Sequence, residues 1–197
     1  MERYFNTEGC CRPQEHYMVN LESRLAEIKK MVDAGKYFTI NRGRQYGKTT
    51  TLEALQEYLK DYIVISMDFQ FMDESDYATT NRFTKAFLRE LCEIPEATCN
   101  MSDSVKKQIS NLKKSEEDAL GMMFSVLSQW CMEAEKKIVL CIDEVDQASN
   151  NQIFLDFLAQ LRGYYLKRNR RPTFLSVILA GVHTVQVDGK TIVEAIV

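Results

Sequence analysis

The chain contains four short runs of apolar, β-prone residues, and longer stretches with helical periodicity separate them. The runs span residues 37–40, 62–67, 138–142 and 174–180. Continuous apolar runs of this length are typical of strands buried on both faces of a parallel sheet. Strands that alternate with helices predict an α/β fold with a mostly parallel sheet between layers of helices.

The remaining segments predict how this core is extended. Residues of about 70–136 are helical and charged, and we expect a helical insertion there. Within it, residues 103–114 carry only a weak apolar stripe, which leaves a solvated helix and a mobile segment both open. We therefore predict a core domain at residues 21–182, after an arm at residues 1–20 and before a tail at residues 183–197.

Composition narrows the class of protein. Lys and Arg number 25 against 28 Asp and Glu, a formal charge of -3, which argues against a protein whose main role is to coat nucleic acid or anionic membrane. No stretch approaches the roughly 18 apolar residues of a membrane helix, and the start lacks the apolar core of a secretory signal. The cysteines are scattered, and Cys131 and Cys141 lie in apolar segments, as expected of reduced core thiols. We expect a cytoplasmic protein with no membrane partner.

A glycine-bearing loop follows the first apolar run and opens a helical pattern, which is the context of a phosphate-binding loop. Gly47 would let the backbone approach a phosphate, and the N–H groups of the new helix would point at the anion. Lys48 would reach the β- and γ-phosphates, and the Thr49 hydroxyl would bind Mg²⁺. The motif is imperfect, because Arg42 stands where a glycine is expected. The predicted nucleotide-binding residues of this loop are Gly43, Arg44, Gln45, Tyr46, Gly47, Lys48, Thr49 and Thr50.

The third apolar run leads into an acidic pair, Asp143 and Glu144. An acid at the carboxyl end of a parallel strand lies beside the phosphate loop. Asp143 would support the metal, and Glu144 would orient and polarise an attacking water, with Lys48 as its catalytic partner. A small-molecule kinase would gain nothing from such a glutamate. The two motifs together predict a P-loop NTPase, a three-layer α/β/α sandwich.

Asp146 follows the acidic pair, and its role stays open. It could support the loop, contact a neighbouring subunit or cap the next helix.

Residues 37–59 (YFTINRGRQYGKTTTLEALQEYL) and residues 138–147 (IVLCIDEVDQ) resemble the bacterial AAA-like ATPases, which are related to the AAA+ and STAND NTPases. That group often carries an R-x-R-Q-x-G-K-[ST] loop, so Arg42 fits the family pattern. The resemblance implies ATP as the nucleotide and contacts to the adenine side from Tyr17 and Met18. An apolar lead-in to a helix is the alternative for these two residues.

The end of the chain departs from this family pattern. A full module would continue with a further helix and strand and usually a helical lid, so we expect a chain truncated after the fourth strand. Residues 183–197 instead alternate around Asp188 and Gly189, which predicts a hairpin. The basic run at residues 167–171 leaves open a solvated loop, a contact to nucleic acid or a partner, and an arginine finger.

The sequence as a whole predicts an ATP-binding AAA-like NTPase that hydrolyses Mg·ATP to ADP and phosphate and couples this to a conformational change. The alternatives are a nucleotide-dependent switch or interaction module with negligible turnover, and an incomplete fragment of a larger ATPase. ATP or ADP and an unidentified protein are the expected partners. Oligomeric state stays open, and net charge does not indicate nucleic acid.

Overall fold

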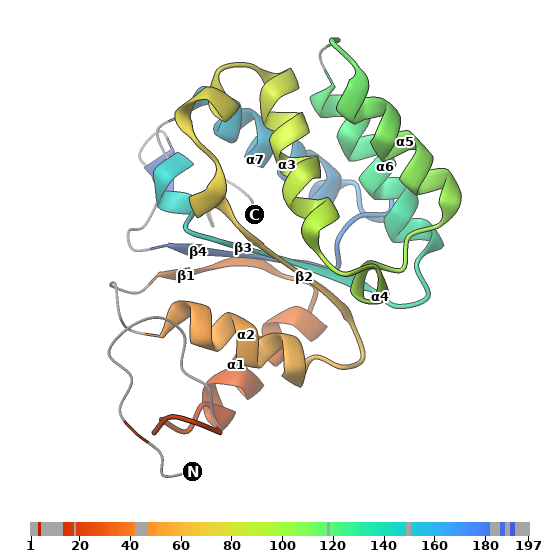
Figure 1. Ribbon diagram of the computed structural model, residues 1–197. Helices are drawn as coiled ribbons and strands as arrows, with labels where there is room; N and C mark the ends of the chain where they lie inside the picture. Colours follow the sequence, from red (N-terminus) through yellow and green to blue (C-terminus); the bar gives the residue numbers. More distant parts are fainter. Residues whose placement is uncertain are drawn as a thin grey trace.

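Four parallel strands form the sheet that the four apolar runs predict (Figure 1). The computed structural model describes residues 4, 14–17, 19–41, 47–117, 119–148, 151–181, 186–187 and 190–191. The strands are β1 (Tyr37–Asn41), β2 (Ile63–Asp68), β3 (Ile138–Asp143) and β4 (Ser176–Gly181), in the order β1-β4-β3-β2. Every residue of β3 and β4 is buried, as expected for the central strands of a covered sheet.

Helices cover both faces of the sheet and give three layers (Figure 1). The α-helices are α1 (Glu22–Asp33), α2 (Lys48–Tyr58), α3 (Thr80–Glu93), α4 (Glu96–Cys99), α5 (Asp103–Lys114), α6 (Leu120–Glu133) and α7 (Gln152–Leu166). Single 3₁₀ turns are η1 (Phe69–Phe71), η2 (Glu74–Tyr77) and η3 (Val145–Ala148). Helices α1 and α2 lie on one face, and α3, α6 and α7 lie on the other (Figure 1). The predicted α/β/α sandwich is therefore confirmed.

Alternation along the strands divides the core into two clusters. Val139 and Cys141 of β3 pack with α1 and α2, whereas Leu140 and Ile142 pack under α3, α6 and α7. Burial raises the pKa of the Cys141 thiol to about 12, which agrees with a reduced core cysteine.

Residues 103–114 form a helix with one buried stripe, which favours the helix over the other alternative that the sequence leaves open. Val105, Ile109 and Leu112 are buried on one stripe of α5, against α3 and α6. Ser102 caps the helix, because its hydroxyl accepts a hydrogen bond from the Val105 N–H. The stripe is narrow because α5 packs on other helices and leaves most of its circumference in water.

The tail contains the predicted antiparallel pairing. Strands β5 (Gln186–Val187) and β6 (Lys190–Thr191) pair on either side of positions 188 and 189. The other residues of 183–197 lie outside the described residues, and the domain limits at 20 and 182 stay predictions. None of the described helices has the length and apolar character needed to cross a membrane.

The aromatic cluster beneath α3 and α7 gives a direct test of the packing. Phe157 is 1% exposed, and its ring lies 5.3 to 6.1 Å from four other phenylalanine rings. Phe157→Ala should lower the free energy of unfolding by about 3–5 kcal/mol in urea denaturation, because it opens a cavity. Phe71→Ala is the control, since Phe71 is 71% exposed and its loss should cost no more than about 0.5 kcal/mol. Equal losses in both variants would contradict this packing.

Candidate functional site

The carboxyl ends of the strands and the start of α2 meet on the left of Figure 1. Gly47 is the N-cap of α2 and has a left-handed backbone, with φ of 70°. Glycine adopts this conformation without the steric penalty of a Cβ atom. Lys48 and Thr49 then form the first turn of the helix, as the sequence predicts.

Lys48 places a buried ammonium group at this edge. Its side chain is 6% exposed, and Nζ lies 3.6 Å from Oε1 of Glu144. Among the described residues, Nζ has no hydrogen-bond partner. A buried charged donor without a hydrogen bond is costly, so this position is suited to an anionic ligand that would accept from Nζ.

Asp143 joins the start of α2 to the end of β3. The Thr49 hydroxyl donates a hydrogen bond of 2.8 Å to Oδ2 of Asp143, and the backbone N–H of Glu144 donates one of 2.9 Å to Oδ1. Asp143 is 5% exposed. Both oxygens of its buried carboxylate are thus satisfied, and the hydroxyl and carboxylate lie together as hard oxygen donors.

Glu144 has a strained backbone that directs its side chain. Its φ is 54°, and Asn100 is the other non-glycine residue with a positive φ in the described chain. A left-handed conformation costs a residue such as glutamate about 1–2 kcal/mol, and such strain collects at functional sites. The turn brings the Glu144 carboxylate toward Lys48 and leaves it 25% exposed.

Asp68 is an acidic residue of this edge that the sequence pattern did not single out. It ends β2 and lies in register with Asp143 of the neighbouring strand. Burial raises the pKa of Asp68 and the charge of Asp143 raises it further, against a lowering by the hydrogen bond from Gln70 N–H. The available signal was its place directly after the second apolar run.

Asp146 fits closely against the end of β4. A Cβ atom on Gly181 would lie 2.8 Å from Oδ1 of Asp146, so a larger residue there would require the Asp146 carboxylate to shift. Of the three roles that the sequence leaves open, this packing favours support of the loop after β3.

The remaining predicted residues are only partly within the described chain. Thr50 lies in the first turn of α2 and is half-buried. Tyr17 is 52% exposed, and its backbone N–H donates to the carbonyl of Tyr4. Its role at an adenine stays a prediction. Five residues lie outside the described residues: Met18, Gly43, Arg44, Gln45 and Tyr46.

The buried ammonium of Lys48 predicts an unusual response to its removal. Lys48→Met should leave the free energy of unfolding without nucleotide within about 1 kcal/mol of the wild-type value, or raise it, because the partly exposed Glu144 keeps access to water. Leu55→Ala on the same helix is the control and should cost about 2–5 kcal/mol, since Leu55 is fully buried. A loss of about 3 kcal/mol or more in Lys48→Met would show instead that the ion pair holds the fold together.

Because the pKa of Asp68 is raised, we predict that Asp68→Asn increases the free energy of unfolding by an amount that depends on pH. Wild-type stability falls as pH rises from the unfolded pKa through the raised folded pKa, because the folded state resists ionisation. In metal-free buffer, Asp68→Asn should therefore be more stable than wild type at about pH 7 and equal to it at about pH 3.5. Urea denaturation at several pH values measures the difference.

Asp73→Asn is the matched control, because its effect on the free energy of unfolding should have the opposite sign to that of Asp68→Asn. Hydrogen bonds from the side chain and backbone of Ser75 lower the pKa of Asp73, so its carboxylate adds stability above the unfolded pKa. Asp73→Asn should lose stability at about pH 7, and the loss should shrink as pH falls below about 4. Two variants that respond to pH in the same direction would contradict the assigned shifts.

Comparison with known proteins agrees with this arrangement. No curated protein matches the chain. The family model of the AAA-like domain matches residues 13–191, which include the phosphate-loop motif and the acidic pair. A match over this much of the sequence shows that the chain belongs to the AAA-like domain family, which indicates a nucleotide-binding domain of the ATPase type.

Proposed function

We propose that the protein binds Mg·ATP at the carboxyl edge of the sheet and hydrolyses it to ADP and phosphate, and that this drives a conformational change. The observation that carries the proposal is the buried Nζ of Lys48, which has no hydrogen-bond partner in the described chain and lies beside a satisfied Thr49–Asp143 pair. A phosphate oxygen would supply the missing acceptor.

The start of α2 adds to the attraction for phosphate. This helix has 11 residues, and its N-cap Gly47 gives no side-chain hydrogen bond to the first turn. The first N–H groups of a helix lack intrahelical partners and carry a partial positive charge. Phosphate oxygens at this position would accept from these groups and from Lys48 together. The predicted contacts of Gly43, Arg44, Gln45 and Tyr46 would complete the loop around the phosphates.

Thr49 and Asp143 fit Mg²⁺ as a cofactor. Mg²⁺ prefers hard oxygen ligands and is usually held by one or two protein oxygens together with substrate phosphates. When bound, it would neutralise charge on the phosphates and so help the phosphoryl group to leave. The edge also favours a cation, because Asp68 and Asp143 end neighbouring strands and Glu144 follows them, and among these three acids the described ion pairs include one of Glu144 with Lys48 and none of Asp68 or Asp143.

Glu144 is the proposed base that orients and polarises the attacking water. Its carboxylate is close to Lys48 and partly exposed, so both a cation and water can reach it. When Lys48 turns to a phosphate oxygen, the Glu144 carboxylate is released from this ion pair and can accept a hydrogen bond from water. The left-handed backbone of Glu144 is a costly conformation of the kind that collects at functional sites, which agrees with a role for this residue.

Adenine recognition is the part of the proposal that rests on the family resemblance. Tyr17 and Met18 are proposed on the adenine side, and ATP is proposed over GTP for the same reason. Tyr17 is exposed and so is accessible to a base.

Glu144→Gln tests the catalytic assignment. It should reduce ATP turnover by about 100-fold or more while Mg·ATP still stabilises the protein against unfolding, because the amide keeps the shape but cannot take a proton. Ligand at a hundredfold excess over its Kd should add about 2.7 kcal/mol of stability. Phosphate release and thermal unfolding measure the two effects.

The control is Lys48→Met, which should lose both turnover and stabilisation by nucleotide. A wild-type protein that Mg·ATP does not stabilise would contradict nucleotide binding. Stabilisation with no turnover above that of Glu144→Gln would support the alternative, a nucleotide-dependent switch, and would remove hydrolysis from the proposal.

A further inference from the structure

The loops that lead into the four strands form a basic surface at the opposite edge of the sheet from the nucleotide site. Because the strands are parallel, residues 34–36, 59–62, 134–137 and 167–175 all lie at this amino edge. They contain eight Lys or Arg residues and two acidic ones. The whole chain has a formal charge of -3, so positive charge is concentrated here. We propose that the amino edge binds the phosphate backbone of duplex nucleic acid.

Helix dipoles do not account for this charge. Helices α1, α2, α6 and α7 end at the amino edge, and each C-terminus carries about half a negative charge. The four together would offset about two positive charges. The net excess of six formal charges in the loops is larger, and the surplus is available to an external anion.

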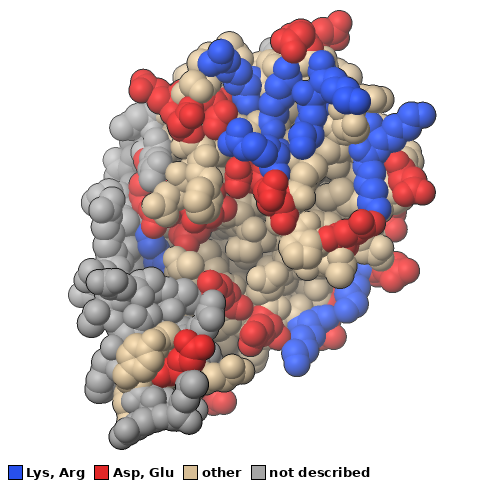
Figure 2. Space-filling model, viewed as in Figure 1, with Lys and Arg blue, Asp and Glu red and all other residues tan. Residues whose placement is uncertain are grey.

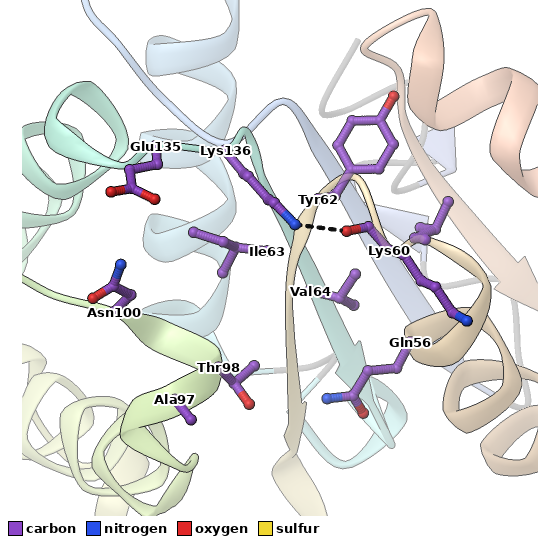
Figure 3. Close-up of a pocket in the computed structure, with 11 residues that line it drawn as sticks. Gln56, Lys60, Tyr62, Ile63, Val64, Ala97, Thr98, Asn100, Glu135 and Lys136 are labelled. Atoms are coloured by element: carbon purple, nitrogen blue, oxygen red, sulfur yellow. Dashed lines mark hydrogen bonds between the residues drawn. The ribbon is translucent and has the colours of Figure 1, made fainter.

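Hydrogen bonds between neighbouring loops hold the amino edge as one surface. Arg168 donates to the carbonyl of Gly35 at 2.7 Å, which joins the loop before β4 to the turn before β1. Lys136 donates to the carbonyl of Lys60 at 2.8 Å, which joins the loops before β3 and β2 (Figure 3). The surface is therefore largely formed before a partner binds, which lowers the entropy cost of binding.

Five other Lys and Arg side chains of the amino edge take part in no such hydrogen bond within the described chain. Their side chains are exposed, and the described chain gives them no hydrogen bond or ion pair; they are Lys36, Lys60, Lys137, Lys167 and Arg170. On α3 and α5, by contrast, Lys85 pairs with Glu116 and Lys106 pairs with Glu96. Figure 2 shows basic and acidic side chains intermixed over that upper face.

The geometry favours duplex phosphates over other anions. Neighbouring strands are about 4.8 Å apart, so the four loops make a row about 15 Å long. A duplex presents about one negative charge per 1.7 Å of its axis, so several phosphates would face this row. A hollow of about 340 Å³ beside β2 adds the polar side chains Gln56, Thr98 and Asn100, which can donate to phosphate oxygens (Figure 3). The one accessible aromatic side chain of these four loops is Tyr62, which is half-buried, donates its hydroxyl to Asp33 and lies under the Lys29 ammonium, so the loops offer no row of free rings on which successive single-stranded bases could stack.

Fluorescence anisotropy with a labelled duplex of about 20 base pairs tests the proposal on the full chain, without nucleotide and over a series of salt concentrations. The edge variant combines Lys137→Gln, Lys167→Gln and Arg170→Gln. The matched control combines Lys107→Gln, Lys113→Gln and Lys114→Gln, which removes the same charge from exposed positions on α5. The edge variant should bind about tenfold more weakly or worse at low salt. The slope of log Kd against log salt should fall by about 0.9 for each phosphate that the variant no longer neutralises.

Further variants and ligands in the same binding experiment distinguish this proposal from the alternatives. The control triple should change the Kd less than about threefold, and a charge-conserving triple (Lys137→Arg, Lys167→Arg, Arg170→Lys) should keep the binding. Lys48→Met should bind the duplex as wild type does, so a failure of the nucleotide proposal would not affect this result. Absence of duplex binding at low salt, or equal losses in the edge and control triples, would overturn the proposal. Tighter binding to phosphatidylserine vesicles or to polyglutamate would also overturn it, in favour of a membrane or an acidic protein.

Discussion

The hydrogen bond from Thr49 to Asp143 connects the two parts of the chain on which the site depends. It fixes the first turn of α2 against the end of β3, and these segments are 94 residues apart in the sequence. Asp143 also accepts from the N–H of Glu144, so one buried carboxylate orients both the helix start and the turn that follows β3. Lys48 and Glu144 each adjoin one partner of this bond in the sequence, and Nζ of Lys48 lies 3.6 Å from Oε1 of Glu144.

The parallel sheet separates charge along the strands. Acidic side chains gather at the carboxyl edge, where Asp68, Asp143, Glu144 and Asp146 end or follow strands, and Lys48 forms an ion pair with Glu144 there. Basic side chains gather in the loops before the strands. The same topology that places the proposed Mg·ATP site at one edge thus leaves an excess of positive charge at the other. Two anionic ligands could then bind without competing for the same groups.

Periodicity and motif context predicted the strands, the layers and the first-turn residues Lys48 and Thr49, because burial on both faces and a strand–loop–helix context leave clear local signals. Features that depend on contacts across the sheet were not predictable in this way. The pairing of Asp68 with Asp143 requires the register of β2 and β3, and the fit of Asp146 on Gly181 requires the neighbouring β4. Glutamate rarely adopts a left-handed backbone, so the local sequence does not predict the left-handed turn at Glu144.

Three features that are unfavourable in the protein alone lie together at the carboxyl edge. Lys48 has a buried ammonium without a described hydrogen bond, Glu144 has a strained backbone, and burial beside Asp143 raises the pKa of Asp68. In the rest of the described chain the one other buried side-chain polar atom without a partner is the Thr84 hydroxyl. Nearly every other buried polar side chain of the described residues has a hydrogen-bond partner, so unfavourable features that arose independently would be expected at scattered positions. Their concentration around one lysine is explained if a ligand with negative oxygens and a bound cation relieves them together.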